Sequence, residues 1–161
     1  MDIQVRKGAR VESAAFAQLN SMAIYQALKL RSDVFVVEQN CVYPDLDDKD
    51  IHEEARHISV YADETDTLVA YARCLPPGVS FQGASIGRVV VHKNHRGKGL
   101  AREIMLLAIA ECQRHWPDAN IEIGAQVYLQ RFYSLLGFQS TSEAYDEDGI
   151  MHINMMLKAE Q

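Results

Sequence analysis

Basic side chains and glycines crowd the segment Val89–Met105, which reads VVVHKNHRGKGLAREIM. An apolar run stops here, and a helical apolar pattern begins after the glycines. Cations at a helix start are unfavourable because the macrodipole is already positive there, and each costs about 0.3–1 kcal/mol. Exposed N–H groups at such a strand-to-helix turn bind anions, and glycine lets a phosphate approach them. The segment predicts a multiply charged phosphate ligand that offsets the charges of Arg96, Lys98 and Arg102.

Other interpretations of this glycine loop differ in how well they fit the residues. A solvated basic turn, in which Gly97 and Gly99 serve only the backbone geometry, needs no ligand. A Walker loop requires GxxxxGK[ST], but Leu100 follows Gly99, so the magnesium-binding hydroxyl is missing. A dinucleotide fingerprint fails because its third glycine or alanine position holds Arg102. A nucleotide-dependent phosphotransferase would suit the basic loop, but it lacks magnesium ligands.

The spacing that fits is Arg96-x-x-Gly99-x-Ala101, which resembles the R/Q-x-x-G-x-G/A pyrophosphate loop of the GCN5-related N-acetyltransferases, the GNAT superfamily. A later segment, RFYSLLGF at 131–138, resembles the FYxxLGF segment of the same superfamily and follows in the expected order. Resemblance to the ElaA subgroup extends over most of the chain and is carried by LKLRSDVFVVEQNCVYPDLDDKD, GRVVV, HWPD, GAQVYLQRFY and YDEDGIMHINM.

This resemblance implies a fold and an activity. The expected fold is a single α/β (α+β) GNAT domain over residues 1–161, with a mixed, mostly antiparallel sheet splayed between its fourth and fifth strands and helices on both faces. The expected activity is acetyl-coenzyme A-dependent N-acetylation of a primary amine, by direct transfer in a ternary complex. A non-catalytic acyl-coenzyme A-binding or sensing module is the alternative, because the same motifs would serve binding alone.

The resemblance also implies roles for individual residues. The Val89 N–H would donate to the thioester carbonyl, and Tyr133 would protonate the leaving thiolate. A phenol with an ordinary pKa near 10 is protonated at neutral pH, so the chemistry of that role is reasonable. Gln126 stands where the superfamily commonly has asparagine at the end of the fifth strand. The residues expected to contact the coenzyme are Val89, Val90, Val91, Arg96, Gly97, Lys98, Gly99, Leu100, Ala101, Gln126 and Tyr133.

A general base is harder to assign from the sequence. A lysine-like amine pays about 4.6 kcal/mol to become neutral at pH 7, whereas a terminal amine pays only about 1.4 kcal/mol, so some substrates scarcely need a strong base. A base that acts through water is equally consistent with the residues. The candidate bases are Glu38, His57, Glu122 and His152.

Acidic residues gather between Tyr43 and Ala55, in a segment without periodicity that we expect to be a loop. The loop could steer a cationic amine toward the site or could be an ordinary solvated surface loop. A calcium loop is excluded because Lys49 occupies a required acidic or amide position, and we expect no metal. The cysteines Cys41, Cys74 and Cys112 lack an evident partner histidine, so covalent transfer has little support.

The elements that must position these residues follow from hydrophobic spacing. The pattern predicts a first helix over 15–31, a short second helix with Ser32 as its N-cap, and an antiparallel hairpin over 56–75 that turns at 63–66. A strand over 84–91 leads into a helix that begins at Leu100 and ends at Pro117. A strand, a helix over 127–138 closed by Gly137, and two final strands complete a mixed sheet.

Composition limits the class of protein. With 48% hydrophobic and 24% charged residues, the 161-residue chain reads as one globular domain, and its net charge of −6 argues against wholesale nucleic-acid binding. An odd number of cysteines without a CxxC pair suits a reducing cytosol. Charges in the first seven residues argue against a signal peptide, and no segment reaches the roughly 18 apolar residues of a membrane span. We expect a soluble cytoplasmic protein that acts on a small-molecule or peptide amine, with the final strands available for a homodimer.

Overall fold

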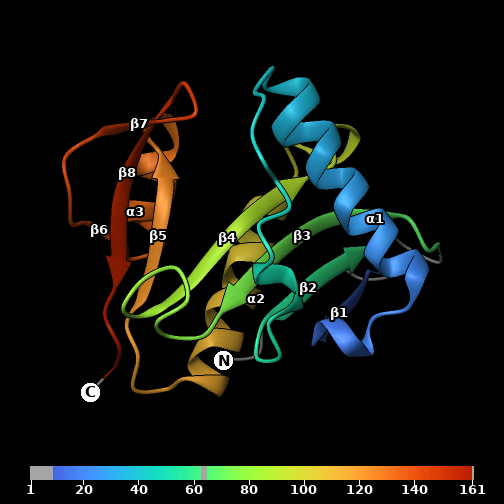
Figure 1. Ribbon diagram of the computed structural model, residues 1–161, viewed down its shortest axis with the longest axis horizontal. Helices are drawn as coiled ribbons and strands as arrows, with labels where there is room; N and C mark the ends of the chain where they lie inside the picture. Colours follow the sequence, from blue (N-terminus) through green and yellow to red (C-terminus); the bar gives the residue numbers. More distant parts are fainter. Residues whose placement is uncertain (1–8, 63–64, 161) are drawn as a thin grey trace.

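The structure is a computed structural model that describes residues 9–62 and 65–160. Within these residues, eight strands form one sheet in the order β1-β2-β3-β4-β5-β8-β6, with β7 paired to β8 (Figure 1). The helices and strands, in chain order, are β1 Arg10–Ala14, α1 Ser21–Arg31, β2 Arg56–Tyr61, β3 Leu68–Leu75, β4 Ala84–Val91, α2 Leu100–His115, β5 Ile121–Gln126, α3 Gln130–Leu135, β6 Gln139–Ser140, β7 Tyr145–Glu147 and β8 Ile150–Leu157.

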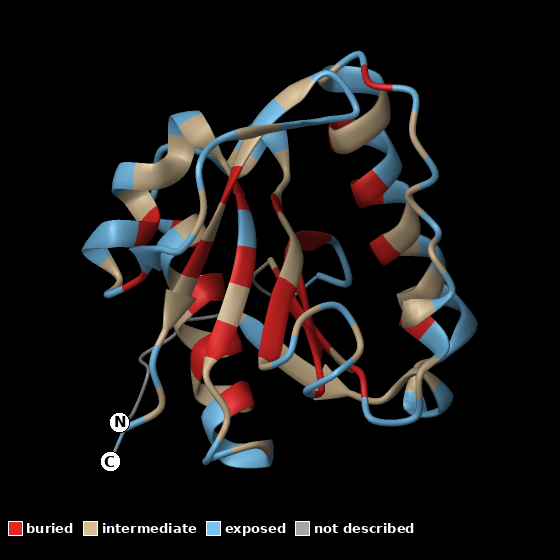
Figure 2. Cartoon of the chain, turned by 60° about the vertical axis from the view of Figure 1, so that its left-hand side comes forward, coloured by how far each residue is buried: buried red, intermediate tan, exposed pale blue. Residues whose placement is uncertain are grey.

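Helices cover both faces of this sheet, as expected (Figure 1). Helix α2 packs its buried residues Ile104, Met105 and Ala108 into the larger core cluster with β2, β3 and β4. Helix α1 packs Ala27 and Leu30 into a second cluster against the other face. All eight residues of β3 are buried because the strand is covered on both faces, which is why its sequence is an almost continuous apolar run. Figure 2 shows the buried residues concentrated in the central strands.

The first helix starts later than its apolar spacing predicts. A single 3-10 turn covers Phe16–Gln18, and α1 begins only at Ser21. Asn20 is the reason, because its side-chain oxygen accepts a hydrogen bond from the Ala23 N–H at 2.8 Å and caps the helix. The prediction of one helix over 15–31 is therefore wrong at its N-terminal end.

The predicted second helix is not a separate element. Ser32 has helical φ and ψ angles of −63° and −47°, so it is not an N-cap, and α1 continues directly into a π-helical segment over Ser32–Glu38. The Lys29–Asp33 ion pair, at 2.6 Å, spans the junction. Short π-helical segments often lie at functional sites.

The central hairpin and the elements around the glycine loop lie where the sequence predicts. Strands β2 and β3 pair antiparallel, and β4 and α2 follow with the expected order and position. Asp63 and Glu64 of the predicted turn lie outside the described residues, as do residues 1–8 and 161 of the expected domain. Strands β1 and β7 are additions: β1 is a short edge strand, and β7 forms a hairpin with β8 through Asp148 and Gly149, both with positive φ.

Strands β4 and β5 separate soon after they meet. They run parallel and pair only at Ala84↔Ile121 and Ser85↔Glu122. Beyond Ser85, the two strands diverge, so the mixed sheet is splayed between its fourth and fifth strands as expected. The split separates β1–β4 from the group formed by β5, β6, β7 and β8.

None of the helices in the described ranges has the length and apolar character that a bilayer-spanning segment requires. Within the same ranges, no three side chains of His, Cys, Asp or Glu type are grouped closely enough to hold a metal ion.

Candidate functional site

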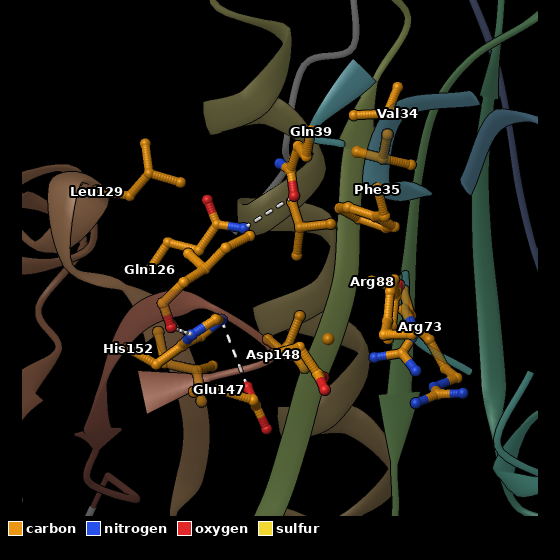
Figure 3. Close-up of a pocket in the computed structure, with 18 of the residues that line it drawn as sticks. Val34, Phe35, Gln39, Arg73, Arg88, Gln126, Leu129, Glu147, Asp148 and His152 are labelled. Atoms are coloured by element: carbon orange, nitrogen blue, oxygen red, sulfur yellow. Dashed lines mark hydrogen bonds and ion pairs between the residues drawn. The ribbon is translucent and has the colours of Figure 1, made fainter. Parts of the chain in front are cut away.

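A cavity of about 680 Å³ lies where β4 and β5 separate (Figure 3). The end of β4, the π-helical segment, α3 and the β7–β8 hairpin all contribute to its walls. Six of the predicted coenzyme-contacting residues line it: Val89, Val90, Val91, Arg96, Gln126 and Tyr133. The two segments that the sequence singles out, 96–101 and 131–138, therefore each contribute one residue to this cavity, Arg96 and Tyr133.

The glycine loop continues from this cavity but does not line it. Gly97 and Gly99 have φ angles of +79° and +80°, which other residues rarely adopt, and Gly99 is the N-cap of α2. A Cβ atom added to Gly97 would meet nothing within 4 Å, so its backbone is open to approach. Gly99 has no side chain with which to cap α2, so the N–H groups that open the helix receive no hydrogen bond from their N-cap residue.

Arg96 forms an ion pair within the protein, which the sequence does not predict. Its guanidinium contacts the Glu38 carboxylate at 2.7 Å and donates from Nε to the Val91 carbonyl at 3.1 Å. The charge of Arg96 alone therefore does not require an external anion. This contact also ties the end of the π-helical segment to the end of β4.

Tyr133 lies on α3 and is buried against the sheet, although it still lines the cavity. Its ring makes edge contacts with Phe132 and Phe138, at centroid distances of 5.0 Å and 6.1 Å. Burial, assisted by the nearby phenol of Tyr128, raises the pKa of Tyr133 to about 12. Its hydroxyl is therefore a proton donor rather than a phenolate at neutral pH.

The four candidate bases lie in different places. Glu38 and His152 line the cavity, whereas His57 and Glu122 do not. His57 is buried on β2, with one ring nitrogen 2.7 Å from the Tyr71 hydroxyl and the other 2.9 Å from the Asp50 carbonyl. Burial lowers the pKa of His57, against the raising effect of the Asp50 carbonyl. Glu122 accepts a hydrogen bond from the Gly83 N–H at 2.7 Å. Both therefore serve the fold, away from the cavity.

His152 on β8 has the geometry that a base requires. Its Nδ1 lies 2.8 Å from the Ile150 carbonyl, which can only accept, so Nδ1 donates there and Nε2 is the nitrogen left to exchange a proton. The Glu147 carboxylate lies 3.4 Å from Nε2 (Figure 3). Tyr145 stacks on the imidazole with ring centroids 6.1 Å apart and fixes its plane. Tyr145 and Glu147 were not among the predicted site residues, and the turn at Asp148-Gly149, which pairs β7 with β8, brings them beside His152.

The acidic segment is only partly solvated: Asp48, Glu53 and Glu54 are exposed, whereas its other carboxylates are partly or fully buried. Three of its carboxylates form a partly buried network with three arginines from α1, β3 and β4. The members of this network are Asp45, Asp47, Asp50, Arg31, Arg73 and Arg88. Their charges sum to zero, so they leave no excess negative charge to attract an amine.

Ionisation within this network follows from its contacts. Burial opposes the charged form of Asp47, but hydrogen bonds and charge from Arg73, together with Arg88, lower its pKa to about 2. Burial likewise opposes ionisation of Asp50, while contacts with Arg31 and Arg73 lower its pKa. Both carboxylates are therefore ionised at neutral pH, despite their burial.

Two side-chain contacts join the two halves of the molecule beside the cavity. Gln126 on β5 donates to the Gln39 side-chain oxygen at 3.3 Å, as Figure 3 shows. The Cys41 thiol donates to the Asp148 carbonyl at 3.3 Å. Cys74 and Cys112 lie in the core away from the cavity, and burial raises the pKa of the Cys74 thiol. A thiol held protonated is a poor nucleophile.

Comparisons with known proteins agree with this geometry. Residues 24–159 match the family model of the acetyltransferase (GNAT) domain. The chain is 42% identical to protein ElaA of Escherichia coli over 139 residues, which cover 86% of this chain and 90% of that protein. The crystal structure of E. coli ElaA superposes with a TM-score of 0.86 at 39% identity and covers 93% of this chain and 99% of its own. An acyl-CoA N-acyltransferase of Pseudomonas aeruginosa gives a TM-score of 0.87 at 35% identity, covering 92% and 99%.

Proposed function

The chain belongs to the GNAT acetyltransferase family, and from this premise we propose that it transfers an acetyl group from acetyl-coenzyme A directly to a primary amine in a ternary complex. The acceptor is a small-molecule or peptide amine. One observation carries the proposal: the Val89 backbone and the Tyr133 side chain, which have complementary chemical roles, line the same cavity at the split of β4 and β5.

The residues around the cavity suit coenzyme A. Gly97 and Gly99 give a diphosphate access to the uncapped N–H groups of Leu100 and Ala101. The edge of Val89–Val91, which faces the split, can hydrogen-bond an extended pantetheine chain as a further strand would. Acetyl-coenzyme A supplies a thioester whose acyl group is activated toward amines.

Two groups of the chain assist transfer at the carbonyl and at sulfur. The Val89 N–H stabilises the negative charge that develops on the carbonyl oxygen, a contribution worth about 10²–10³ in rate for a single donor. The Tyr133 hydroxyl donates its proton to the departing sulfur, a role that suits a phenol kept protonated by burial. No covalent step on a cysteine is needed.

Among the candidate bases, His152 is the one we assign to the acceptor amine. Its Nε2 lone pair accepts the amine proton, directly or through one water molecule, and the nearby Glu147 carboxylate then stabilises the imidazolium. Glu38 is a weaker candidate because its carboxylate already accepts a hydrogen bond from Arg96 at 2.7 Å.

Substitution of the imidazole tests this assignment. His152→Gln should lower kcat/KM for the amine by about 10²–10⁴-fold, because glutamine cannot accept the amine proton. The Kd for coenzyme A should stay within about threefold of wild type. Glu38→Gln serves as the comparison and should lose much less activity. Wild-type kcat/KM in His152→Gln would return the role to Glu38 or to water.

The proposed reaction predicts release of free thiol from acetyl-coenzyme A in the presence of an amine. We expect this release with one or more members of a panel of polyamines, amino acids and peptides. Coenzyme A alone should give heat in calorimetry and raise the melting temperature, because it binds the folded state. Binding without thiol release would favour an acyl-coenzyme A-binding module. Nucleotide binding that does not displace coenzyme A would favour a phosphotransferase, and a stable acetyl-cysteine would refute direct transfer.

A further inference from the structure

Arg88 has an unusual backbone conformation in the middle of β4. Its φ angle is +53°, a left-handed value that a long side chain rarely adopts within a strand. The register of β3 and β4 shifts here, since Arg73 pairs with Gly87 while Tyr71 pairs with Val90. Arg88 and Val89 together therefore stand opposite Ala72, which defines a β-bulge. Bulges of this kind redirect backbone and side chains next to active sites.

The bulge releases the Val89 amide from regular strand pairing. Val89 has no partner in the described register with β3, and β5 pairs with β4 only at Ala84 and Ser85. Val89 is nevertheless one of the residues that line the cavity. The direction of its N–H therefore depends on the conformation of Arg88, the preceding residue.

The side chain of Arg88 is fixed by several contacts with one short segment, 43–47. Its Nη2 donates to the Asp45 carbonyl at 3.0 Å and contacts the Asp47 carboxylate at 3.2 Å. Its Nε lies 2.9 Å from the Asp45 carboxylate. The guanidinium also lies over the Tyr43 ring, 5.5 Å from its centroid.

Two further arginines, from α1 and β3, also contact segment 43–47. Arg31, which is 1% exposed, contacts Asp45 at 2.9 Å, and Arg73 contacts Asp47 at 2.7 Å. Asp50 joins these two arginines, with distances of 2.7 Å and 2.8 Å. The anchor of Arg88 is therefore connected to α1 and β3 and is not a mobile loop end.

We propose that Arg88 is a positioning residue for acetyl transfer: its anchored guanidinium holds the left-handed bulge that aims the Val89 N–H into the cavity. This inference rests on the proposed function for its catalytic consequence. Arg88 also lines the cavity, but its guanidinium is engaged by segment 43–47, so the role that we assign to it is to position Val89 and not to contact the reacting atoms. A glycine at this position would adopt the same φ without strain, so the arginine serves for its side-chain contacts and not for its backbone preference.

The decisive variant is Arg88→Gly, which accepts the bulge conformation but loses the anchor. We expect kcat to fall about 10–100-fold while the KM for acetyl-coenzyme A changes less than about threefold, because a misdirected N–H loses part of the 10²–10³ that one donor supplies. Arg88→Lys keeps the charge with fewer contacts and should fall between wild type and Arg88→Gly. The matched control is Arg56→Ala on β2, which removes a partly buried arginine that contacts Glu111 and the Ser13 carbonyl away from the cavity.

A measurement on the Val89 amide that requires no catalysis tests this inference separately from the proposed function. The protection of the Val89 amide against hydrogen exchange, corrected for its new neighbour, should fall in Arg88→Gly, with no comparable change in Arg56→Ala. Wild-type kcat in Arg88→Gly, or a Val89 protection equal to that of the control, would overturn the positioning role. Equal loss of kcat in Arg88→Gly and Arg56→Ala would also overturn it, since that pattern reports general destabilisation. If the wild-type protein shows no acetyl transfer, the proposed function fails and the Val89 protection alone decides the claim.

Discussion

Replacing Tyr133 with Phe should lower kcat for acetyl transfer by about 10²–10⁴-fold while the Kd for coenzyme A stays within about threefold. The substitution removes only the hydroxyl that protonates the leaving sulfur. The ring keeps its edge contacts with Phe132 and Phe138, so the packing of α3 against the core should persist. Steady-state thiol release gives kcat, and calorimetry with coenzyme A gives the Kd.

Tyr128 provides the matched comparison for this experiment. It also lines the cavity and precedes α3, but its side chain is mostly exposed. Tyr128→Phe should leave kcat within about threefold of wild type, since its hydroxyl is not the assigned acid. If Tyr128→Phe loses turnover and Tyr133→Phe does not, the acid role belongs to Tyr128. Wild-type turnover in both variants would mean that water protonates the sulfur.

The elements that the sequence predicts well are those that are determined by their own residues. The apolar run of β3 is eight residues long, and all of these residues are buried. The apolar residues of α2 recur at helical spacing over several turns, and they are buried on one face of the helix. The glycine loop is equally local, because Gly97 and Gly99 adopt positive φ angles that favour glycine. Local rules therefore place the start of α2, whereas the cavity depends on where β4 and β5 separate.

The network around Arg88 is harder to predict because its partners are far apart in sequence. Asp45 and Asp47 lie 43 and 41 residues from Arg88, so no periodicity links them. A signal does exist: Arg73 and Arg88 interrupt apolar strands, and a charged residue at a buried position needs an opposite charge. That rule, applied to the acidic segment, would have predicted ion pairs instead of a solvated or steering loop.

Histidines show the same division between local and distant information. His57 and His152 both lie in strands, yet one is enclosed by Tyr71 and the Asp50 carbonyl while the other lines the cavity. An isoleucine follows each histidine, so the strand pattern alone does not tell which one lies at a cavity. His152 pairs with Gln126 at the end of β5, beside the split of β4 and β5, whereas His57 lies on β2. The β7–β8 hairpin is easier to predict from the sequence, since the dipeptide Asp148-Gly149 is a strong hairpin signal.

Removal of Arg31 should give the largest loss of stability, about 3–5 kcal/mol in the free energy of unfolding at pH 7. Arg31 is almost fully buried and contacts both Asp45 and Asp50, so its loss leaves carboxylates with too little compensating charge. Urea unfolding of Arg31→Ala measures the effect. Arg10→Ala is the control: its ion pairs with Glu12 and Asp66 are half exposed, and such pairs contribute about 0–1 kcal/mol.

The pH dependence of this loss identifies its cause. Contacts with Arg31 and Arg73 lower the pKa of Asp50 below its ordinary 3.8, so the wild-type network stabilises the fold above that pH and loses this contribution as the pH falls. In Arg31→Ala, the uncompensated carboxylate is neutralised by the same acid, and the difference between variant and wild type should narrow below about pH 4. A difference that stays constant with pH would show that lost packing, and not unpaired charge, destabilises the variant. Arg31→Lys keeps the charge without the forked contacts, and it should therefore lose less stability than Arg31→Ala at pH 7.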